Sequence, residues 1–254
     1  MFYNFSRAIV RSPGASVVNG LSEVGIKPDY NLLVIEHTKY VDTLLKLGLK
    51  VDVLDPEDTL PDSVFVEDPA LTFANGTILL EPGAPSRKGE RGLIQPHLTQ
   101  TFDTVFELVE GSAEGGDVLR LNKEVLIGLS DRTNELGARA LKKLLLELGQ
   151  ESRIVETPRG VLHFKSDCSA LDEDTILATP RLANSGIFEN YNVILTPENE
   201  YSAANSLRVN EKLLVPNGYP RTAELLSKKF DVEIVGITEV AKLDAGLSCM
   251  SLRW

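Results

Sequence analysis

Cysteine and histidine are scarce in this chain of 254 residues, which has two cysteines and three histidines. Cys249 lies in a glycine-flanked segment of small residues, 246–251, where the backbone can approach a ligand closely. His163 lies in a β-type run, 161–165, where a polar ring that faces inward needs a partner. A cysteine and a remote histidine can act as nucleophile and base only if the fold brings them together. A buried inert cysteine and a hydrogen-bonded structural histidine are the alternatives.

The remaining cysteine and histidines are expected to have no catalytic role. Cys168 is expected to be a buried, unreactive thiol. His37, in a long amphipathic segment, and His97, in a polar one, are expected at the surface, because a neutral imidazole is comfortable in water. Two cysteines are too few for a disulfide framework, so both are expected to be free.

Two acidic segments supply carboxylates to accompany such a pair. In PDSVFVEDP, residues 61–69, Asp62 and Asp68 bracket a Val-Phe-Val core that is expected to be a strand. In AEGGD, residues 113–117, Glu114 stands beside two flexible glycines. Solvated loop carboxylates are the ordinary outcome for both segments. The apolar core of the first nevertheless places part of its acidic set at an apolar boundary.

A repeated unit must position these residues. Two hairpins of one pattern, 119–126 and 207–214, are each followed by Arg-Thr, a helix and a β-rich segment. Weaker copies begin at 71–80, with an Asn-Gly hairpin turn, and at 170–177. A fifth copy is split between the two ends of the chain. Its parts are 247–253, 6–10, an amphipathic helix at 30–47 and a strand at 50–54.

Repeats of this size stack or close into a ring, because one unit cannot bury its apolar face alone. Five units joined through the chain ends predict an α/β fold, namely a five-bladed α/β propeller of ββαβ-type repeats, with residues 1–254 as one catalytic domain. A doubly wound α/β sheet is the alternative, but no glycine-rich phosphate loop follows any strand. In a ring, loops from several units converge on the central axis, so site residues can lie far apart in sequence.

Composition and charge narrow the partners. The chain is 43% hydrophobic and 25% charged, which is typical of a globular protein. No apolar run approaches the roughly 18 to 20 residues that cross a bilayer, and the N-terminus lacks a signal-peptide block, so we expect a cytoplasmic protein without a membrane partner. A net charge of -11 argues against nucleic acid and is compatible with a cationic small-molecule substrate. A homodimer is left open.

Seven segments together resemble the dimethylarginine dimethylaminohydrolase family, in colinear order from Arg11 to the C-terminus. They are PDSVFVEDP (61–69), SRKGE (86–90), EGGD (114–117), SDRTNELGAR (130–139), LHFK (162–165), NGYPRT (217–222) and LSCMS (247–251). That family belongs to a guanidine-modifying group with a five-bladed α/β-propeller fold, the architecture that the repeats also predict.

The resemblance implies hydrolysis of N-ω-methylated arginines to citrulline and a methylamine, with no metal or organic cofactor. It matches Cys249 to the nucleophile, His163 to the general acid and base, and Glu114 to the carboxylate that orients the histidine. It matches seven positions to substrate binding: Glu67 and Asp68 at the guanidinium, Asp62, Arg87 and Arg132 at the amino acid end, and Leu21 and Leu243 through their backbones. Ala245 departs from the family, which often has glycine there, so the loop geometry is less certain than the chemistry.

Other functions of the same fold group remain as alternatives. An arginine deiminase or an amidinotransferase typically has aspartate two residues after the catalytic histidine, where it grips unsubstituted guanidinium nitrogens. Here that residue is Lys165, which favours a methylated substrate. A non-catalytic amino-acid binder is the third hypothesis, and the joint presence of Cys249, His163 and Glu114 argues against it.

Overall fold

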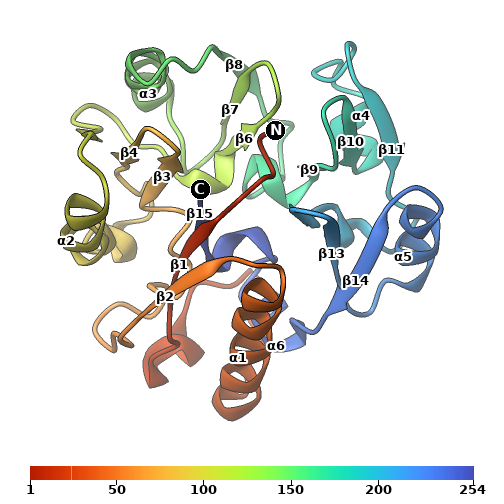
Figure 1. Cartoon of the computed structure of the whole chain (residues 1–254), viewed down its shortest axis with the longest axis horizontal. Helices are drawn as coiled ribbons and strands as arrows, with labels where there is room; N and C mark the ends of the chain where they lie inside the picture. The colour runs from red at the N-terminus through yellow and green to blue at the C-terminus, as the bar shows by residue number, and fades with distance from the viewer. Residues whose placement is uncertain (24) are drawn as a thin grey trace.

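The computed structural model describes residues 1–23 and 25–254 and shows a ring of five units around one axis (Figure 1). Each unit holds a three-stranded sheet in which the middle strand pairs antiparallel with one neighbour and parallel with the other. A helix connects the two parallel strands and lies toward the outside of the ring (Figure 1). The α/β class, the propeller and the ββαβ repeat are thus confirmed.

Four of the units are continuous in sequence. The second unit consists of β3 (Ala70–Phe73), β4 (Gly76–Leu79), α2 (Glu90–Thr101) and β5 (Val105–Glu107), and the third of β6 (Val118–Arg120), β7 (Val125–Leu129), α3 (Glu135–Glu147) and β8 (Ser152–Glu156). The fourth consists of β9 (Cys168–Ala170), β10 (Thr175–Ala178), α4 (Pro180–Ala183) and β11 (Asn192–Leu195), and the fifth of β12 (Leu207–Val209), β13 (Lys212–Pro216), α5 (Pro220–Ser227) and β14 (Asp231–Val235).

The first unit is assembled from both ends of the chain, as the split repeat predicts. It contains β1 (Arg7–Arg11), α1 (Tyr30–Lys46) and β2 (Lys50–Leu54), and β15 (Leu252–Arg253) supplies its inner strand. Strand β1 pairs parallel with β2 and antiparallel with β15, with Ala8 opposite Arg253 and Ile9 opposite Leu252. The short helix α6 (Thr238–Ala241) precedes this closing segment.

Local sequence explains where the helices begin. The side chain of Asp29 accepts a hydrogen bond from Leu32 N at the start of α1, and Asn134 caps α3 in the same way. Helices α4 and α5 both have proline in their first turn, where the missing N–H costs nothing. The apolar faces of α1, α3 and α5 pack on the sheets of their own and of neighbouring units. The hydrophobic core therefore lies between the units, and space is left along the axis.

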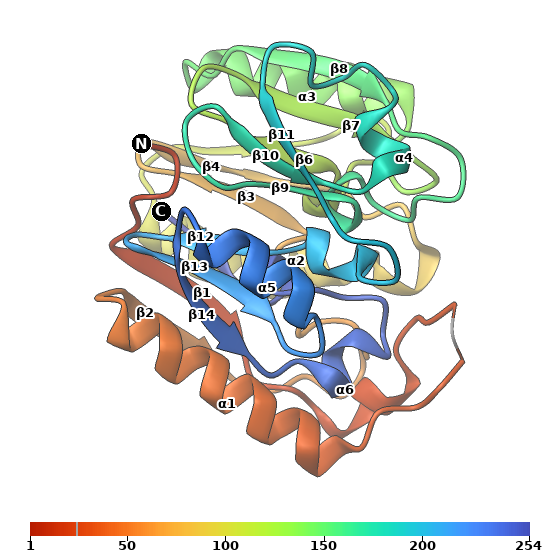
Figure 2. The ribbon, with the colours of Figure 1, turned by 90° about the vertical axis from the view of Figure 1, so that its right-hand side faces the viewer.

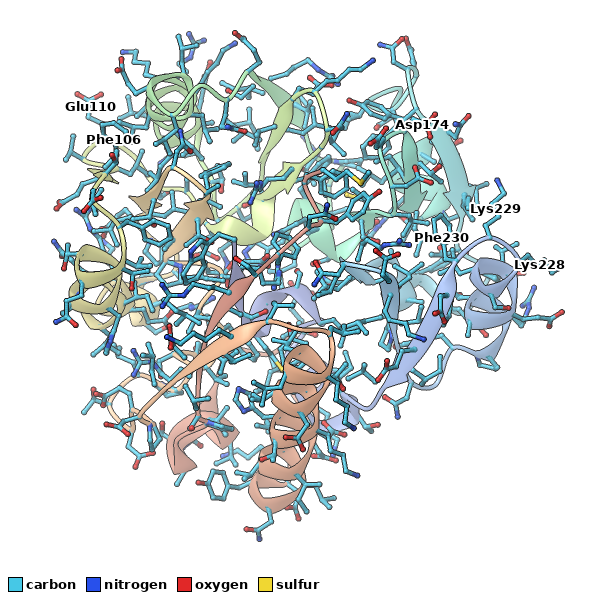
Figure 3. All side chains as sticks on the ribbon, viewed as in Figure 1. Phe106, Glu110, Asp174, Lys228, Lys229 and Phe230 are labelled. Carbon is cyan, nitrogen blue, oxygen red and sulfur yellow. The ribbon has the colours of Figure 1, made fainter. Side chains whose placement is uncertain are left out.

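The outer rim of the ring is polar. Glu110, Asp174, Lys228 and Lys229 lie there (Figure 3). Figure 2 shows α1 and α3 along opposite outer faces. In the part of the chain that the structure describes, every helix is too short or too polar to span a membrane.

Three local expectations were wrong. Val64–Val66 lies in consecutive turns, with Phe65 N donating to Asp62 O and Asp68 N to Phe65 O, and is not a strand. His163 precedes a 3₁₀ turn, Phe164–Ser166, rather than lying in a β-run. His37 is only 3% exposed, because it lies on the inner face of α1 with Leu33, Tyr40 and Leu44. His97 is exposed, as expected.

Candidate functional site

The candidate site is built from one repeated position: the residues just before the inner strand of each unit. Glu67 and Asp68 precede β3, Glu114 precedes β6, His163 precedes β9, and Cys249 precedes β15. The inner strands surround the axis (Figure 1), and three of these residues, Asp68, His163 and Cys249, line one cavity. The ring therefore brings together residues separated by up to 182 positions in sequence, from Glu67 to Cys249.

A cavity at this end contains most of the predicted residues. It is lined by Cys249, His163, Asp62, Asp68, Arg87, Arg132, Leu21 and Leu243, together with Ser22, Glu23, Phe65, Leu162, Asp244 and Ala245. Glu114 lies behind His163 and is fully buried. A second cavity adjoins the first and shares His163, Cys249 and Ala245 with it.

The Glu114 carboxylate fixes the histidine ring. His163 Nε2 lies 2.6 Å from Glu114 Oε2, while Glu114 Oε1 accepts from the backbone N–H groups of Gly83 and Ala84. Burial opposes a charge on His163, but Asp68, Glu114 and Asp117 outweigh it and raise the histidine pKa to about 9. At neutral pH this ring is an imidazolium with a proton to give.

The glycines of the EGGD segment are explained by close approach. A Cβ on Gly115 would meet the carbonyl oxygen of Glu67 at 2.0 Å, and one on Gly116 would meet the His163 ring at 2.8 Å. Asp117, which is fully buried, accepts from Phe164 N at 2.8 Å and from the hydroxyls of Ser130 and Thr133. The segment thus supplies the orienting carboxylate and also holds the backbone that carries His163.

Asp68 lies beside two cationic groups, the guanidinium of Arg87 and the ring of His163. Arg87 Nη1 donates to Asp68 Oδ2 at 2.6 Å, and Gly116 N donates to Oδ1 at 2.8 Å. Burial alone would raise the pKa of Asp68, but Arg87 and the charge of His163 lower it to about 2. The side chain is therefore an anion in the cavity that contains the thiol.

The guanidinium of Arg87 is largely occupied by hydrogen bonds within the protein. It is 4% exposed, and its guanidinium donates to Glu90, to Asp68 and to the Phe65 carbonyl. Arg132 is freer, because the carboxylate nearest to it, that of Glu114, is 3.7 Å away and its side chain is 18% exposed. Asp62 accepts from Leu21 N at 3.0 Å, which ties the loop after β1 to the cavity.

Glu67 lies elsewhere than the resemblance implies. Its carboxylate receives Lys165 Nζ at 2.5 Å, Ser248 Oγ at 2.8 Å and Arg253 Nη2 at 3.2 Å. It lines a different cavity, in the pore along the axis, rather than the one that contains Cys249 and Asp68. Its position supports the nucleophile loop, since Glu67 N donates to the Cys249 carbonyl at 3.2 Å.

The two thiols differ in exposure, and Cys168 is buried as expected. Cys168 is 1% exposed, and burial raises its pKa well above the usual value. Cys249 is half-buried at the cavity wall, where burial, followed by the charges of Glu67 and Asp68, raises its pKa to about 12. Gly246 N and Lys165 act in the opposite direction. In the ligand-free protein Cys249 is a thiol.

A metal is the other occupant that these side chains suggest. Asp68, Glu114 and His163 offer ligand atoms within 4.8 Å of one another. Their atoms are already engaged, however: Arg87 lies 2.6 Å from Asp68 and 4.0 Å from Glu114, and His163 bonds Glu114. A guanidinium and an imidazolium thus already supply the positive charge that a metal would bring.

Sequence reasoning missed Asn205, which precedes β12 and completes the five-fold set. Its Nδ2 donates to the Lys165 carbonyl at 3.0 Å and to Ser248 Oγ at 3.2 Å, and its Oδ1 accepts from Ser248 N at 3.1 Å. A Cβ on Gly246 would meet Asn205 Cγ at 2.3 Å. Aligning the residue before each inner strand would have pointed to it.

Comparisons with known proteins identify the class first. The family model described as arginine deiminase matches residues 33–215, and the ring of five units agrees with it, so the chain is a propeller protein of the arginine deiminase type. An N(G),N(G)-dimethylarginine dimethylaminohydrolase from Pseudomonas aeruginosa is 36% identical over 98% of this chain and 100% of its own. One from Streptomyces coelicolor is 32% identical over 97% and 96%.

A solved structure agrees. That of the dimethylarginine dimethylaminohydrolase from Pseudomonas aeruginosa, a mutant complexed with citrulline, superposes with a TM-score of 0.95 at 35% identity, covering 99% of this chain and 100% of that one. The present chain belongs to the dimethylarginine dimethylaminohydrolase family.

Proposed function

We propose that the protein hydrolyses N-ω-methylated arginines to citrulline and methylamine or dimethylamine. The observation that carries this proposal is the joint placement of Cys249, an imidazolium at His163 and an anionic Asp68 on one cavity. A thiol, a proton donor and a carboxylate are what displacement of an amine from a guanidinium needs. Citrulline, the product, is also bound by the Pseudomonas relative.

Substrate placement follows from the charges that line the cavity. A guanidinium is a planar cation that a carboxylate can orient, and Asp68 is the anion beside the thiol. The substrate carboxylate needs a fork-shaped donor, which Arg132 offers more fully than Arg87, because Arg87 is engaged by Glu90 and Asp68. Asp62 is placed to accept the α-ammonium group.

The reaction proceeds in two halves. The Cys249 thiolate attacks the guanidinium carbon, and His163 gives a proton to the nitrogen that leaves, so that methylamine or dimethylamine departs as a neutral molecule. An S-alkylthiouronium remains on Cys249. Water, deprotonated by His163, adds to the same carbon, and the C–S bond then breaks to restore the thiolate. The hydroxyl proton of the resulting cation passes to solvent, and neutral citrulline leaves.

The hydrogen bond between His163 and Glu114 supports a division of roles between the two ring nitrogens. Because Nε2 is held by Glu114, Nδ1 is the atom that exchanges protons with substrate and water. The buried Glu114 keeps the ring oriented and stabilises its charged form. Glu67 acts indirectly in this proposal, by holding Lys165 and Ser248 behind the nucleophile loop.

A substrate panel tests the proposal. We expect methylated arginines to give citrulline and free amine with a kcat/KM roughly ten- to a hundredfold above that of arginine, since a methylated nitrogen has fewer donors to leave unpaired. Equal turnover of arginine would instead establish the deiminase alternative that the family model names. A cytoplasmic location is part of the same proposal and is supported by two free cysteines.

A further inference from the structure

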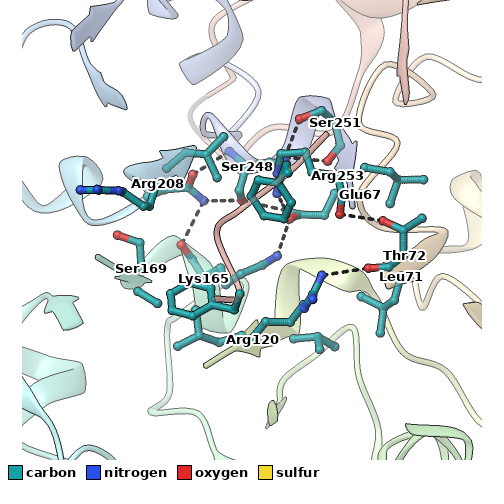
Figure 4. Close-up of a pocket in the computed structure, with 18 of the residues that line it drawn as sticks. Glu67, Leu71, Thr72, Arg120, Lys165, Ser169, Arg208, Ser248, Ser251 and Arg253 are labelled. Carbon is teal, nitrogen blue, oxygen red and sulfur yellow. Dashed lines mark hydrogen bonds and ion pairs between the residues drawn. The ribbon is translucent and has the colours of Figure 1, made fainter. Parts of the chain in front are cut away.

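The pore along the axis of the ring is a charged cavity, and it is separate from the two cavities that His163 lines. It is lined by parts of all five inner strands and by Phe2 and Phe5 of the N-terminal segment (Figure 4). Neither His163, Asp68 nor Arg132 lines it. The ion pairs of Glu67 with Lys165 and Arg253 mark its boundary with the nucleophile loop.

The charges of this pore do not balance. Arg120, Lys165, Arg208 and Arg253 line it, and Glu67 is the one carboxylate among the described lining residues. The Arg208 guanidinium is otherwise engaged, since it lies over the rings of Tyr3 and Phe230 and donates to the Asn210 carbonyl. These contacts do not neutralise its charge, so four cations face one carboxylate on the pore wall.

Arg120, like Arg208, has no counter-charge among the described residues. Lys165 and Arg253 both pair with Glu67, whereas the described carboxylates include no ion-pair partner for Arg120. Its Nη1 donates to the Thr72 carbonyl at 2.9 Å, and its guanidinium lies 4.5 Å from the centre of the Phe73 ring. Burial, and then the charge of Arg253, lower its pKa to about 10. Arg120 is half-buried, and a cation withdrawn this far from water is costly unless it is paired.

Two further polar atoms on the pore wall lack partners. Ser169 Oγ and Arg253 Nε are both buried and make no hydrogen bond to any described residue. Ser169 is 8% exposed, and Figure 4 shows it across the pocket from Thr72, with Lys165 and Arg120 between them. Both atoms can donate a hydrogen bond.

We propose that the pore is a binding site for a small inorganic oxyanion, with Arg120 as its principal ligand and Ser169 and the Lys165–Arg253 side as further donors. A guanidinium fork suits two oxygens of one oxyanion better than it suits a spherical ion. The anion supplies the missing counter-charge to Arg120 and stabilises the meeting point of the five inner strands. This site does not depend on the reaction proposed above.

Inorganic phosphate is the probe. At fixed pH and ionic strength, replacing sodium chloride by sodium phosphate is expected to raise the Tm of the whole protein by about 3 °C at ten times the dissociation constant. Arg120→Met should abolish this increase and should raise the Tm in phosphate-free buffer, because an unpaired, half-buried cation is removed. Arg139→Met, at an exposed position on α3, is the matched control and should behave as wild type.

Arg132→Met separates the two cavities. If the phosphate effect survives in Arg132→Met and is lost in Arg120→Met, the pore site stands. If it is lost in Arg132→Met and kept in Arg120→Met, phosphate binds in the substrate cavity and the proposal is wrong. Calorimetric titration of the wild type should show one site that Ser169→Ala weakens severalfold, and the absence of a titratable site would also overturn it.

Discussion

The carboxylate of Glu67 lies 2.5 Å from the ammonium of Lys165, and the backbone N–H of Glu67 donates to the carbonyl of Cys249. The nucleophile loop is therefore supported by a carboxylate whose charge is offset by lysine. Glu67 and Asp68 both raise the pKa of Cys249, and Lys165 lowers it. Lysine at this position thus counteracts part of the rise that the two carboxylates cause in the pKa of Cys249.

Replacing Lys165 by methionine should slow alkylation of Cys249. Without the ammonium, Glu67 faces the thiol uncompensated, and we expect the alkylation rate at pH 8 to fall roughly three- to tenfold, corresponding to an increase of about half to one pKa unit. The measurement is the rate of iodoacetamide labelling of Cys249, quantified by mass spectrometry. Lys142→Met, on α3, is the control. An unchanged rate in Lys165→Met would show that Lys165 has no electrostatic role.

A bound cation should populate the thiolate. The pKa of Cys249 is raised to about 12 by burial and by two carboxylates, so a guanidinium in the cavity reverses part of that effect. We expect the titration midpoint of thiolate absorbance to fall by at least one pH unit when a non-reactive alkylguanidinium is bound. A midpoint that does not move would reject substrate assistance and require another route to the thiolate.

The two cysteines should respond oppositely to substitution by serine. Cys249→Ser removes the soft nucleophile with almost no change of shape, so turnover should fall by more than a thousandfold while the Tm stays within about 2 °C of wild type. Cys168→Ser should keep most activity, because Cys168 is buried and donates only to the Phe164 carbonyl. Steady-state citrulline formation decides between them. An inactive Cys168→Ser with an active Cys249→Ser would reverse the assignment.

Asn205 should act on kcat by holding the nucleophile loop. Asn205→Asp keeps the acceptor for Ser248 N but loses both donors of Nδ2. We expect kcat to fall roughly ten- to a hundredfold, corresponding to about 1 to 3 kcal/mol, with KM changed less than threefold. Asn192→Asp, at an exposed strand end, is the control. A lower Tm with an unchanged kcat would reduce Asn205 to a purely structural residue.

His37 should make the fold sensitive to acid. Burial lowers its pKa to about 4, and its Nε2 has no partner among the described residues. The unfolded chain therefore binds the extra proton between about pH 6.5 and pH 4, so the stability that neutral His37 contributes is complete above pH 6.5 and is lost as the pH falls. Between pH 7 and pH 5 this loss is roughly 2 kcal/mol.

Urea unfolding of wild type and His37→Leu at both pH values isolates this contribution. The difference in unfolding free energy between the two proteins should shift by that amount, because the other titrating groups are common to both. Parallel pH dependences would show that His37 does not control the acid response.

The sequence predicted the ring because its evidence is local and repeated. A hairpin followed by a helix and a β-rich segment recurs along the chain, and the split unit follows from the same template. The spacing of Leu33, His37, Tyr40 and Leu44 also indicated an inward histidine, had the helical period been weighed above the general preference of imidazole for water.

What local sequence does not contain is the pairing of distant side chains. Val64–Val66 has strand composition, but the carbonyls of Asp62 and Phe65 accept from Arg87 Nη2 and from nearby N–H groups, so the segment turns. The ion pairs of Glu67 with Lys165 and Arg253 likewise form only because three units meet at the axis. Such contacts are set by the closed ring.

Ring closure also sets an order of events during synthesis. Strand β15 completes the first sheet by pairing with β1, and Cys249 lies three residues before it. The ribosome therefore releases the nucleophile together with the strand that closes the ring, after the other four sheets have emerged. Until Leu252 has emerged, β1 can pair only with β2, so the first sheet is the last of the five to be completed. Contacts between the two chain ends are also the slowest class to form, which makes closure the expected rate-limiting step of folding.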